Sequence, residues 1–248
     1  MGKMIEIQSG GVVNAYLSEP SGQAKGGIIV IQEVWGLDDH IKSVADRFAA
    51  EGYVALAPSF FELSDISAEE LTTIKTDLFD EVKRVAVQPR LRELTAPMHD
   101  PEFGKLTSSR LSACFDYLYD LPTTNQKVAV IGFCFGGTYS YNLAVIEPRL
   151  KIAFPFYGHS DQSVDELRNI TCPVRAFYGQ NDTGLISGLD DLKARMAEAG
   201  VDYKAKVYPD CAHAFFNDTN PVVYNKAAAD DAWGIVKAEL ASAFALAS

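Results

Sequence analysis

The sequence holds little that would build a covalent or metal-bound scaffold. Its 248 residues include four cysteines, which lie far apart and form no C-x-x-C pair. This spacing favours free thiols in a reducing cytoplasm over a disulfide framework or a zinc site. A chain of this length also buries enough surface to fold without either kind of cross-link.

Positive charge and long apolar runs are scarce as well. There are 22 Lys and Arg against 33 Asp and Glu, so the formal net charge is −11, and no basic cluster is present. This balance argues against a nucleic-acid partner. The longest apolar runs, such as 128–135, are too short to span a bilayer, and the first residues do not resemble a secretory signal. We expect a cytoplasmic monomer or homodimer that acts on a small molecule and binds neither nucleic acid nor membrane.

Buried strands alternate with helices along the chain. Continuous apolar runs are typical of strands in a parallel sheet covered by helices on both faces, and they occur at 27–31, 53–57, 127–131, 152–157 and 174–178. Helical patterns and two further strand regions complete the expected elements: a hairpin over 4–17, helices at 38–51, 67–85, 108–121, 136–145, 189–199 and from 225 onward, and a strand at 203–208. The order predicts an α/β fold with a mostly parallel sheet.

No linker or repeat divides the chain, which favours a single domain over residues 1–248. The stretch 59–126 is less regular than the rest. Pro89, Pro97 and Pro101 are expected to interrupt its helical pattern. We expect this segment to form a cap or a pocket wall.

The most specific motif is Gly-Phe-Cys-Phe-Gly-Gly at residues 132–137. It follows a buried strand and precedes a helix, as does the G-x-S-x-G turn that presents a nucleophilic serine, here replaced by Cys134. Glycines at 132 and 136 leave room for the tight turn, and the helix N-terminus favours a thiolate. The alternative interpretation is a buried, inert cysteine beside packing glycines.

A nucleophilic thiol needs a base, and two residues follow in the order that this turn requires. Asp182 ends one predicted strand, and His213 follows the last one. The chain order nucleophile, acid, histidine is the order of enzymes with this turn. Taken alone, Asp182 could be a turn residue and His213 a loop residue. Of the four histidines, however, only His213 comes after the acid.

A carboxylate also follows the first buried strand. Glu33 therefore lies at the same edge of the predicted sheet, where it either contacts Cys134 or is a solvated rim residue. The same loop offers the backbone N–H of Val34, which together with that of Phe135 would bind an oxyanion.

At these residues the chain resembles the dienelactone hydrolase family over nearly its full length. The shared motifs are Gln32-Glu33-x-Trp35-Gly36, the run 49–58, the cysteine turn, Tyr178-Gly179-x-Asn181-Asp182 and His213-x-Phe215. The resemblance implies an α/β-hydrolase fold, a Cys134-His213-Asp182 triad, and a Glu33 that holds the Cys134 proton until substrate arrives. It also implies hydrolysis of lactones and esters.

The sequence departs from the family in the residues that follow His213, among other places. The type members carry an arginine shortly after the catalytic histidine to hold a substrate carboxylate, whereas the residues after His213 are Ala, Phe, Phe, Asn and Asp. A pocket lined by Trp35, Phe60 and Phe215 would favour a less charged ester than dienelactone.

The predicted reaction is acyl transfer through a thioester, with no metal or organic cofactor. Other functions stay open: a redox-reactive cysteine protein of this fold, or a non-catalytic relative that binds a ligand. A glutamine-amidotransferase-like enzyme is disfavoured because a His-x-Glu pair is missing, and a phosphate-binding loop because no Lys-Ser/Thr follows the glycines.

Overall fold

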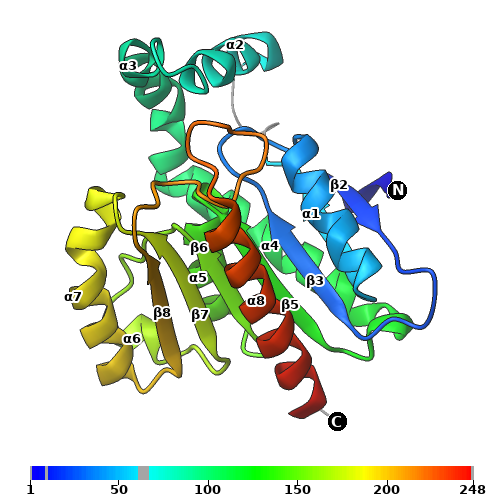
Figure 1. The fold of residues 1–248 in the computed structure, drawn as a ribbon. Coiled ribbons are helices and arrows are strands. Elements are labelled where there is room, and N and C mark those ends of the chain that lie inside the picture. The colour runs from blue at the N-terminus through cyan, green and yellow to red at the C-terminus, as the bar shows by residue number, and fades with distance from the viewer. Residues whose placement is uncertain (1, 9–10, 61–66, 247–248) are drawn as a thin grey trace.

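The computed structural model describes residues 2–8, 11–60 and 67–246. Within them, one sheet holds eight strands in the order β1-β2-β4-β3-β5-β6-β7-β8 (Figure 1). The strands are β1 Lys3–Gln8, β2 Val12–Ser18, β3 Gly27–Ile31, β4 Val54–Pro58, β5 Val128–Phe133, β6 Ala153–Phe156, β7 Val174–Gly179 and β8 Tyr203–Tyr208. β2 runs antiparallel to β1 and β4, and the pairs from β4 to β8 are parallel. The predicted α/β fold with an N-terminal pair of strands is confirmed, although the hairpin residues 9–10 lie outside the described part.

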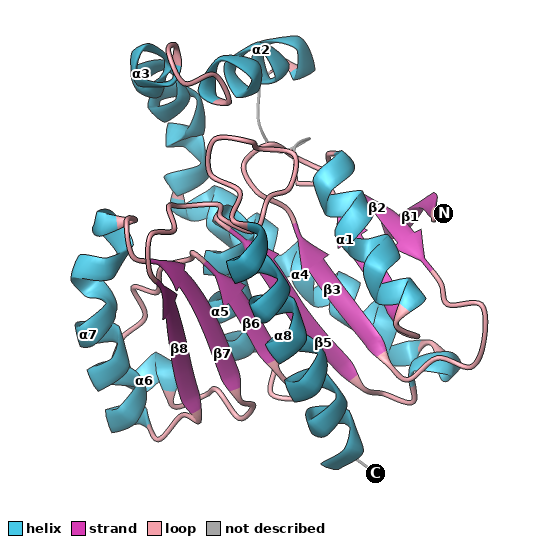
Figure 2. Cartoon of the chain, viewed as in Figure 1, coloured by secondary structure: helices cyan, strands magenta, loops and turns pink. Residues whose placement is uncertain are grey.

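Helices cover both faces of this sheet (Figure 2). They are α1 Asp39–Ala50, α2 Ala68–Leu78, α3 Arg84–Thr95, α4 Pro101–Asp120, α5 Phe135–Ile146, α6 Val164–Leu167, α7 Thr183–Ala199 and α8 Lys226–Leu246. Along β3, Ile28 and Val30 belong to the hydrophobic cluster that includes side chains of α1 and α8, whereas Ile29 and Ile31 belong to the cluster that includes side chains of α4, α5 and α7. This alternation explains why the strand is apolar throughout, since both of its faces are buried.

The first part of the least regular stretch forms α2 and α3, which stand above the carboxyl edge of the sheet, whereas α4 from the same stretch packs against the sheet (Figure 1). The prediction of one helix up to residue 85 is wrong, because α2 ends at Leu78 and α3 begins at Arg84. Pro89 lies inside α3, where its ring is exposed and displaces no packed neighbour, and Pro101 opens α4, where its missing N–H costs nothing. Residues 61–66 of the expected cap lie outside the described part.

In the part of the chain that the structure describes, we find no helix whose length and apolar character would let it traverse a bilayer.

Candidate active site

Cys134 occupies a sharp turn between β5 and α5. Its backbone has φ 55° and ψ −111°, a conformation that non-glycine residues rarely adopt. A Cβ atom at Gly132 would collide with the carbonyl of Gly136, and one at Gly136 with the carbonyl of Ile31. The glycines of the motif are therefore required by the close approach of the chain, and the turn places a half-buried thiol at the N-terminus of a helix.

Asp182 and His213 meet beside this turn. Asp182 follows β7 and precedes α7, whereas His213 lies in the loop after β8. The distance from His213 Nδ1 to Asp182 Oδ2 is 2.5 Å. Because a carboxylate only accepts hydrogen bonds, Nδ1 is the donor, which leaves Nε2 to act toward Cys134.

The surroundings of His213 favour its protonated form. Burial opposes the charge, but attraction to Cys134 and hydrogen bonds with Asp182 and Cys134 outweigh it and raise the pKa of His213 well above its usual range. An imidazolium that stays protonated at neutral pH can give its proton to a leaving group.

Glu33 is a buried carboxylate at the end of β3, with 2% of its surface exposed. Asn217 donates a hydrogen bond to Oε2 at 2.7 Å, and the Tyr157 hydroxyl donates one to Oε1 at 3.3 Å. Burial raises the pKa of Glu33, while attraction to His40 and the bond from Asn217 act in the opposite direction. Such a carboxylate is a stronger base than a solvated one, which suits it to accept a thiol proton.

Tyr157 and Asn217 are members of this network that the sequence did not reveal. Tyr157 has φ 38°, and its ring lies 5.0 Å from that of His213. It follows β6, so its position after a buried strand was a usable signal. Asn217 follows His213 by a few residues in an irregular loop, and no pattern there distinguishes it.

The predicted oxyanion donors flank the thiol. Val34 and Phe135 both line the cavity that contains Cys134. Among the described residues, neither of their backbone N–H groups has a hydrogen-bond acceptor, so both are available to a substrate oxygen.

The cavity has a volume of about 610 Å³ and lies between the sheet edge and the upper helices. Its floor contains Glu33, Cys134 and His213, and Trp35 lies on its wall. Phe60 and Phe215 do not line it: both are buried beneath, where Phe60 packs near the ring of Phe135. The apolar wall is completed by α2 and α3 through Leu78, Phe79 and Leu91.

Two arginines also face this cavity. Arg84 and Arg92 lie two turns apart on α3, together with Gln88 on the same side of the helix. Within the described ranges, neither guanidinium forms an ion pair or a hydrogen bond. The expectation of an apolar pocket lined by aromatic side chains is therefore corrected, since Arg84 and Arg92 bring positive charge to it from α3 and not from the loop after His213.

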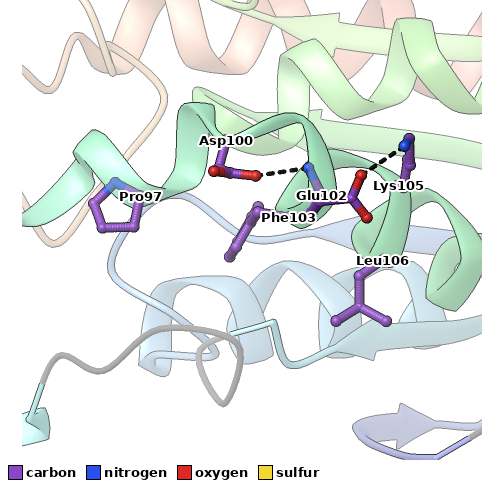
Figure 3. Close-up of a pocket in the computed structure, with 6 residues that line it drawn as sticks. All are labelled: Pro97, Asp100, Glu102, Phe103, Lys105 and Leu106. Carbon is purple, nitrogen blue, oxygen red and sulfur yellow. Dashed lines mark hydrogen bonds and ion pairs between the residues drawn. The ribbon is translucent and has the colours of Figure 1, made fainter.

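A second hollow, with a volume of about 650 Å³, opens at the start of α4. Asp100 accepts a hydrogen bond from the backbone of Glu102, whose carboxylate pairs with Lys105 (Figure 3). None of the six lining residues is a thiol, an imidazole or a nucleophilic hydroxyl. Of these two hollows, only the cavity that contains Cys134 is lined by a thiol and by imidazoles.

The described residues contain no candidate metal site. Within the described residues, no three His, Cys, Asp or Glu side chains are grouped so that they could hold a metal ion.

A model of the dienelactone hydrolase family matches residues 13–244, which is nearly the whole chain. The chain belongs to the dienelactone hydrolase family. The predictions of this family and of its α/β-hydrolase fold are thus confirmed, as is the prediction of an enzyme that hydrolyses ester bonds.

Individual relatives agree with this assignment. A protein from Saccharolobus solfataricus, named provisionally as a carboxymethylenebutenolidase, is 31% identical, and the match covers 93% of this chain and 94% of that one. Protein usf of Aquifex pyrophilus is 33% identical over 96% and 97% of the two chains. The crystal structure of a provisionally named dienelactone hydrolase from Klebsiella pneumoniae has the same fold, with a TM-score of 0.80, 24% identity, and coverage of 97% and 98%.

Proposed function

We propose that the protein hydrolyses a small lactone or carboxylic ester, with Cys134 as nucleophile and a thioester as intermediate. The observation that carries this proposal is the pair His213–Asp182, which lies beside a thiol held in a strained turn at the floor of the cavity. An inert structural cysteine would need neither the strain nor the polarised imidazole.

In the first half of the reaction, substrate binding moves the Cys134 proton to Glu33. The thiolate then attacks the ester carbonyl carbon, and the N–H groups of Val34 and Phe135 bind the developing oxyanion. As the carbon–oxygen bond to the leaving group breaks, the His213 imidazolium protonates that oxygen. For a lactone the leaving hydroxyl stays attached to the acyl group.

In the second half, His213 takes a proton from water, and the resulting hydroxide attacks the thioester. The carbon–sulfur bond breaks and releases the carboxylic acid, while the Cys134 thiolate recovers its proton from Glu33. Asp182 holds the imidazole in one tautomer throughout and stabilises its charge. Cys134, Glu33 and His213 all return to their starting protonation states, so the net reaction consumes only ester and water.

The substrate class follows from the walls of the cavity. Trp35 and the apolar side chains of α2 and α3 suit a hydrocarbon portion, and Arg84 and Arg92 suit a carboxylate on the substrate. We therefore infer an ester or lactone that carries a negative charge, with the segment 59–126 acting as the pocket wall. A cytoplasmic location and a monomeric or homodimeric state stay predictions.

The direct test is hydrolysis of p-nitrophenyl acetate by Cys134→Ala. We expect kcat/KM to fall at least about a thousandfold, because the covalent step is lost. Cys172→Ala is the matched control, since Cys172 is a buried free thiol outside the cavity and its removal should leave the rate unchanged. If Cys134→Ala retains wild-type hydrolysis, the proposed mechanism is wrong.

A further inference from the structure

A second histidine is buried close to the cysteine turn, against Phe133, and does not line the cavity. His40 stands in the first turn of α1, and its side chain is only 1% exposed. Its ring packs edge-on against Phe133, at 5.7 Å between centroids, and against Phe216, at 6.3 Å. An apolar ring would fill this aromatic cage without the desolvation that an imidazole suffers, so the histidine calls for another reason.

The two ring nitrogens of His40 have different partners. Nδ1 lies 3.1 Å from Asp218 Oδ1, and because the carboxylate accepts, Nδ1 carries a proton. Nε2 is buried and, within the described residues, has no hydrogen-bond partner. An unsatisfied buried nitrogen costs about 1–3 kcal/mol, and native structures keep few of them.

The loop that carries His213 also links His40 to Glu33. Asn217 donates to Glu33, and the next residue, Asp218, accepts from His40. The orientation of the Asn217 amide is determined by Thr219, whose N–H and hydroxyl both donate to Oδ1, so that Nδ2 must face Glu33. One short segment therefore carries His213, the Asn217 amide that donates to Glu33, and the Asp218 carboxylate that accepts from His40.

Acidic and basic side chains alternate from Glu33 outward. Attraction to His40 is the strongest influence that lowers the pKa of Glu33, and it opposes the burial that raises it. Asp218 is stabilised as a carboxylate by its hydrogen bond with His40 and by Arg47, whose guanidinium lies 4.2 Å above the ring of Trp233. The sequence of groups from the nucleophile outward is a carboxylate, an imidazole, a carboxylate and a guanidinium.

We propose that His40 is a positioning residue that keeps Glu33 ionised in the resting site, and that Asp218 holds His40 in place for this role. A proton on the second ring nitrogen of His40 would favour the ionised forms of both Glu33 and Asp218. Without it, the buried Glu33 would remain protonated to higher pH and could not accept the Cys134 proton. The proposal rests on the proposed function, because it assigns Glu33 the part of proton acceptor.

The charged and titratable groups that bear on this pair come from several elements. Asp38 before α1 and His213 in the loop after β8 act on Glu33, and Tyr157 after β6 donates a hydrogen bond to it. Asp218, in the same loop as His213, pairs with His40. Arg47 on α1 acts on Asp218, and Cys134 after β5 acts on Tyr157. Asp38 raises the pKa of Glu33 and is itself paired with Lys75 at 2.5 Å. His40 is therefore the buried group whose removal changes the charge balance at Glu33 most.

The test is the pH profile of kcat/KM for p-nitrophenyl acetate in His40→Asn. The asparagine amide can still donate to Asp218 from the position of Nδ1, but the charge and the Nε2 atom are lost. We expect the acidic limb to move up by about one pH unit, so that kcat/KM falls about tenfold below the limb and stays within about twofold above it. Asp218→Asn should shift the limb in the same direction and by less. A structural role alone would lower activity evenly at all pH values.

Two further variants make the outcome decisive. In a Glu33→Gln background, His40→Asn should produce no additional shift, because the effect passes through Glu33. Asp202→Asn removes one of the two carboxylates that pair with Arg175, at the opposite edge of the sheet, and should leave the profile in place.

An unshifted acidic limb in His40→Asn, or an even loss of activity across the range, would overturn the inference. If His40→Asn does not fold, Asp218→Asn decides by the same criterion. Activity retained in Cys134→Ala would instead show that the proposed function fails, so the two failures are distinguishable.

Discussion

The edge of the sheet and the cap above it are built in different ways. At the edge, β3 and β5 are buried along their whole length, and the side chains of Glu33 and Asp182 are held by hydrogen bonds. In the cap, α3 contains no buried residue, and Val82 and Val85 are 88% and 77% exposed. The first region is held by packing, whereas the second contributes side chains to the cavity with little burial of its own.

This difference separates chemistry from selectivity. Proton transfer and covalent attack need atoms held to within a fraction of an ångström, which a packed sheet edge supplies. A wall that recognises a substrate tolerates more freedom, since a charged side chain attracts a carboxylate over a longer distance. Substitutions at the edge should therefore change the rate of the reaction, and substitutions in the cap should change which substrate is accepted.

The largest effect is expected from Asp182→Asn. The variant keeps the shape of the site but removes the charge that stabilises the His213 imidazolium, so kcat/KM should fall about a thousandfold. Because Asp182 raises the pKa of His213, its loss should also move the alkaline limb of the pH profile to lower pH. The measurement is the profile for p-nitrophenyl acetate, and an alkaline limb at the wild-type position would contradict the assigned role of Asp182.

An intermediate effect is expected on stability, and it compares the two regions directly. Leu111→Ala in α4 empties a fully buried site beneath the sheet and should lower the free energy of unfolding by about 2–5 kcal/mol. Val85→Ala in the cap should change it by less than about 0.5 kcal/mol, because the side chain is exposed. The free energy of unfolding of both variants is measured by urea denaturation. Comparable losses of stability in the two variants would contradict the expectation and show that the cap is packed as tightly as the core.

The smallest effect is expected from the cap arginines. Arg84→Ala and Arg92→Ala should each raise KM for a carboxylate-bearing ester by about tenfold, which corresponds to the loss of one charge-assisted contact. Hydrolysis of neutral p-nitrophenyl acetate should be unchanged in both. Steady-state kinetics with the two esters make the comparison, and an equal loss for both substrates would assign the arginines to general support of the cap.

The sheet edge was predictable because its signals are local. Apolar runs indicate strands buried on both faces, and the carboxyl ends of parallel strands lie at one edge of the sheet. Glu33, Cys134, Asp182 and His213 could therefore be predicted to lie at this edge from their positions after strands. The need for glycines in the cysteine turn was equally predictable, because a side chain at Gly132 or Gly136 would collide with neighbouring backbone.

The cap was predicted poorly, and the reason is physical. Helices with little burial have weak apolar periodicity, so the end of α2 and the passage of α3 through Pro89 left no clear pattern. The direction of Arg84 and Arg92 depends on how α3 is placed over the cavity, which no local rule determines. Phe60 and Phe215 were assigned to the pocket for their aromatic character, but their positions close to the strands bury them.

The central claim, a thioester formed on the sulfur of Cys134, can be tested by trapping it. His213→Asn removes the base that activates water, so the second half of the reaction should stall. After brief exposure to p-nitrophenyl acetate and an acid quench, intact and peptide mass spectrometry should find one acetyl group, located on the peptide that carries Cys134. An unmodified protein that still releases p-nitrophenol, or acetyl located on another residue, would contradict the account.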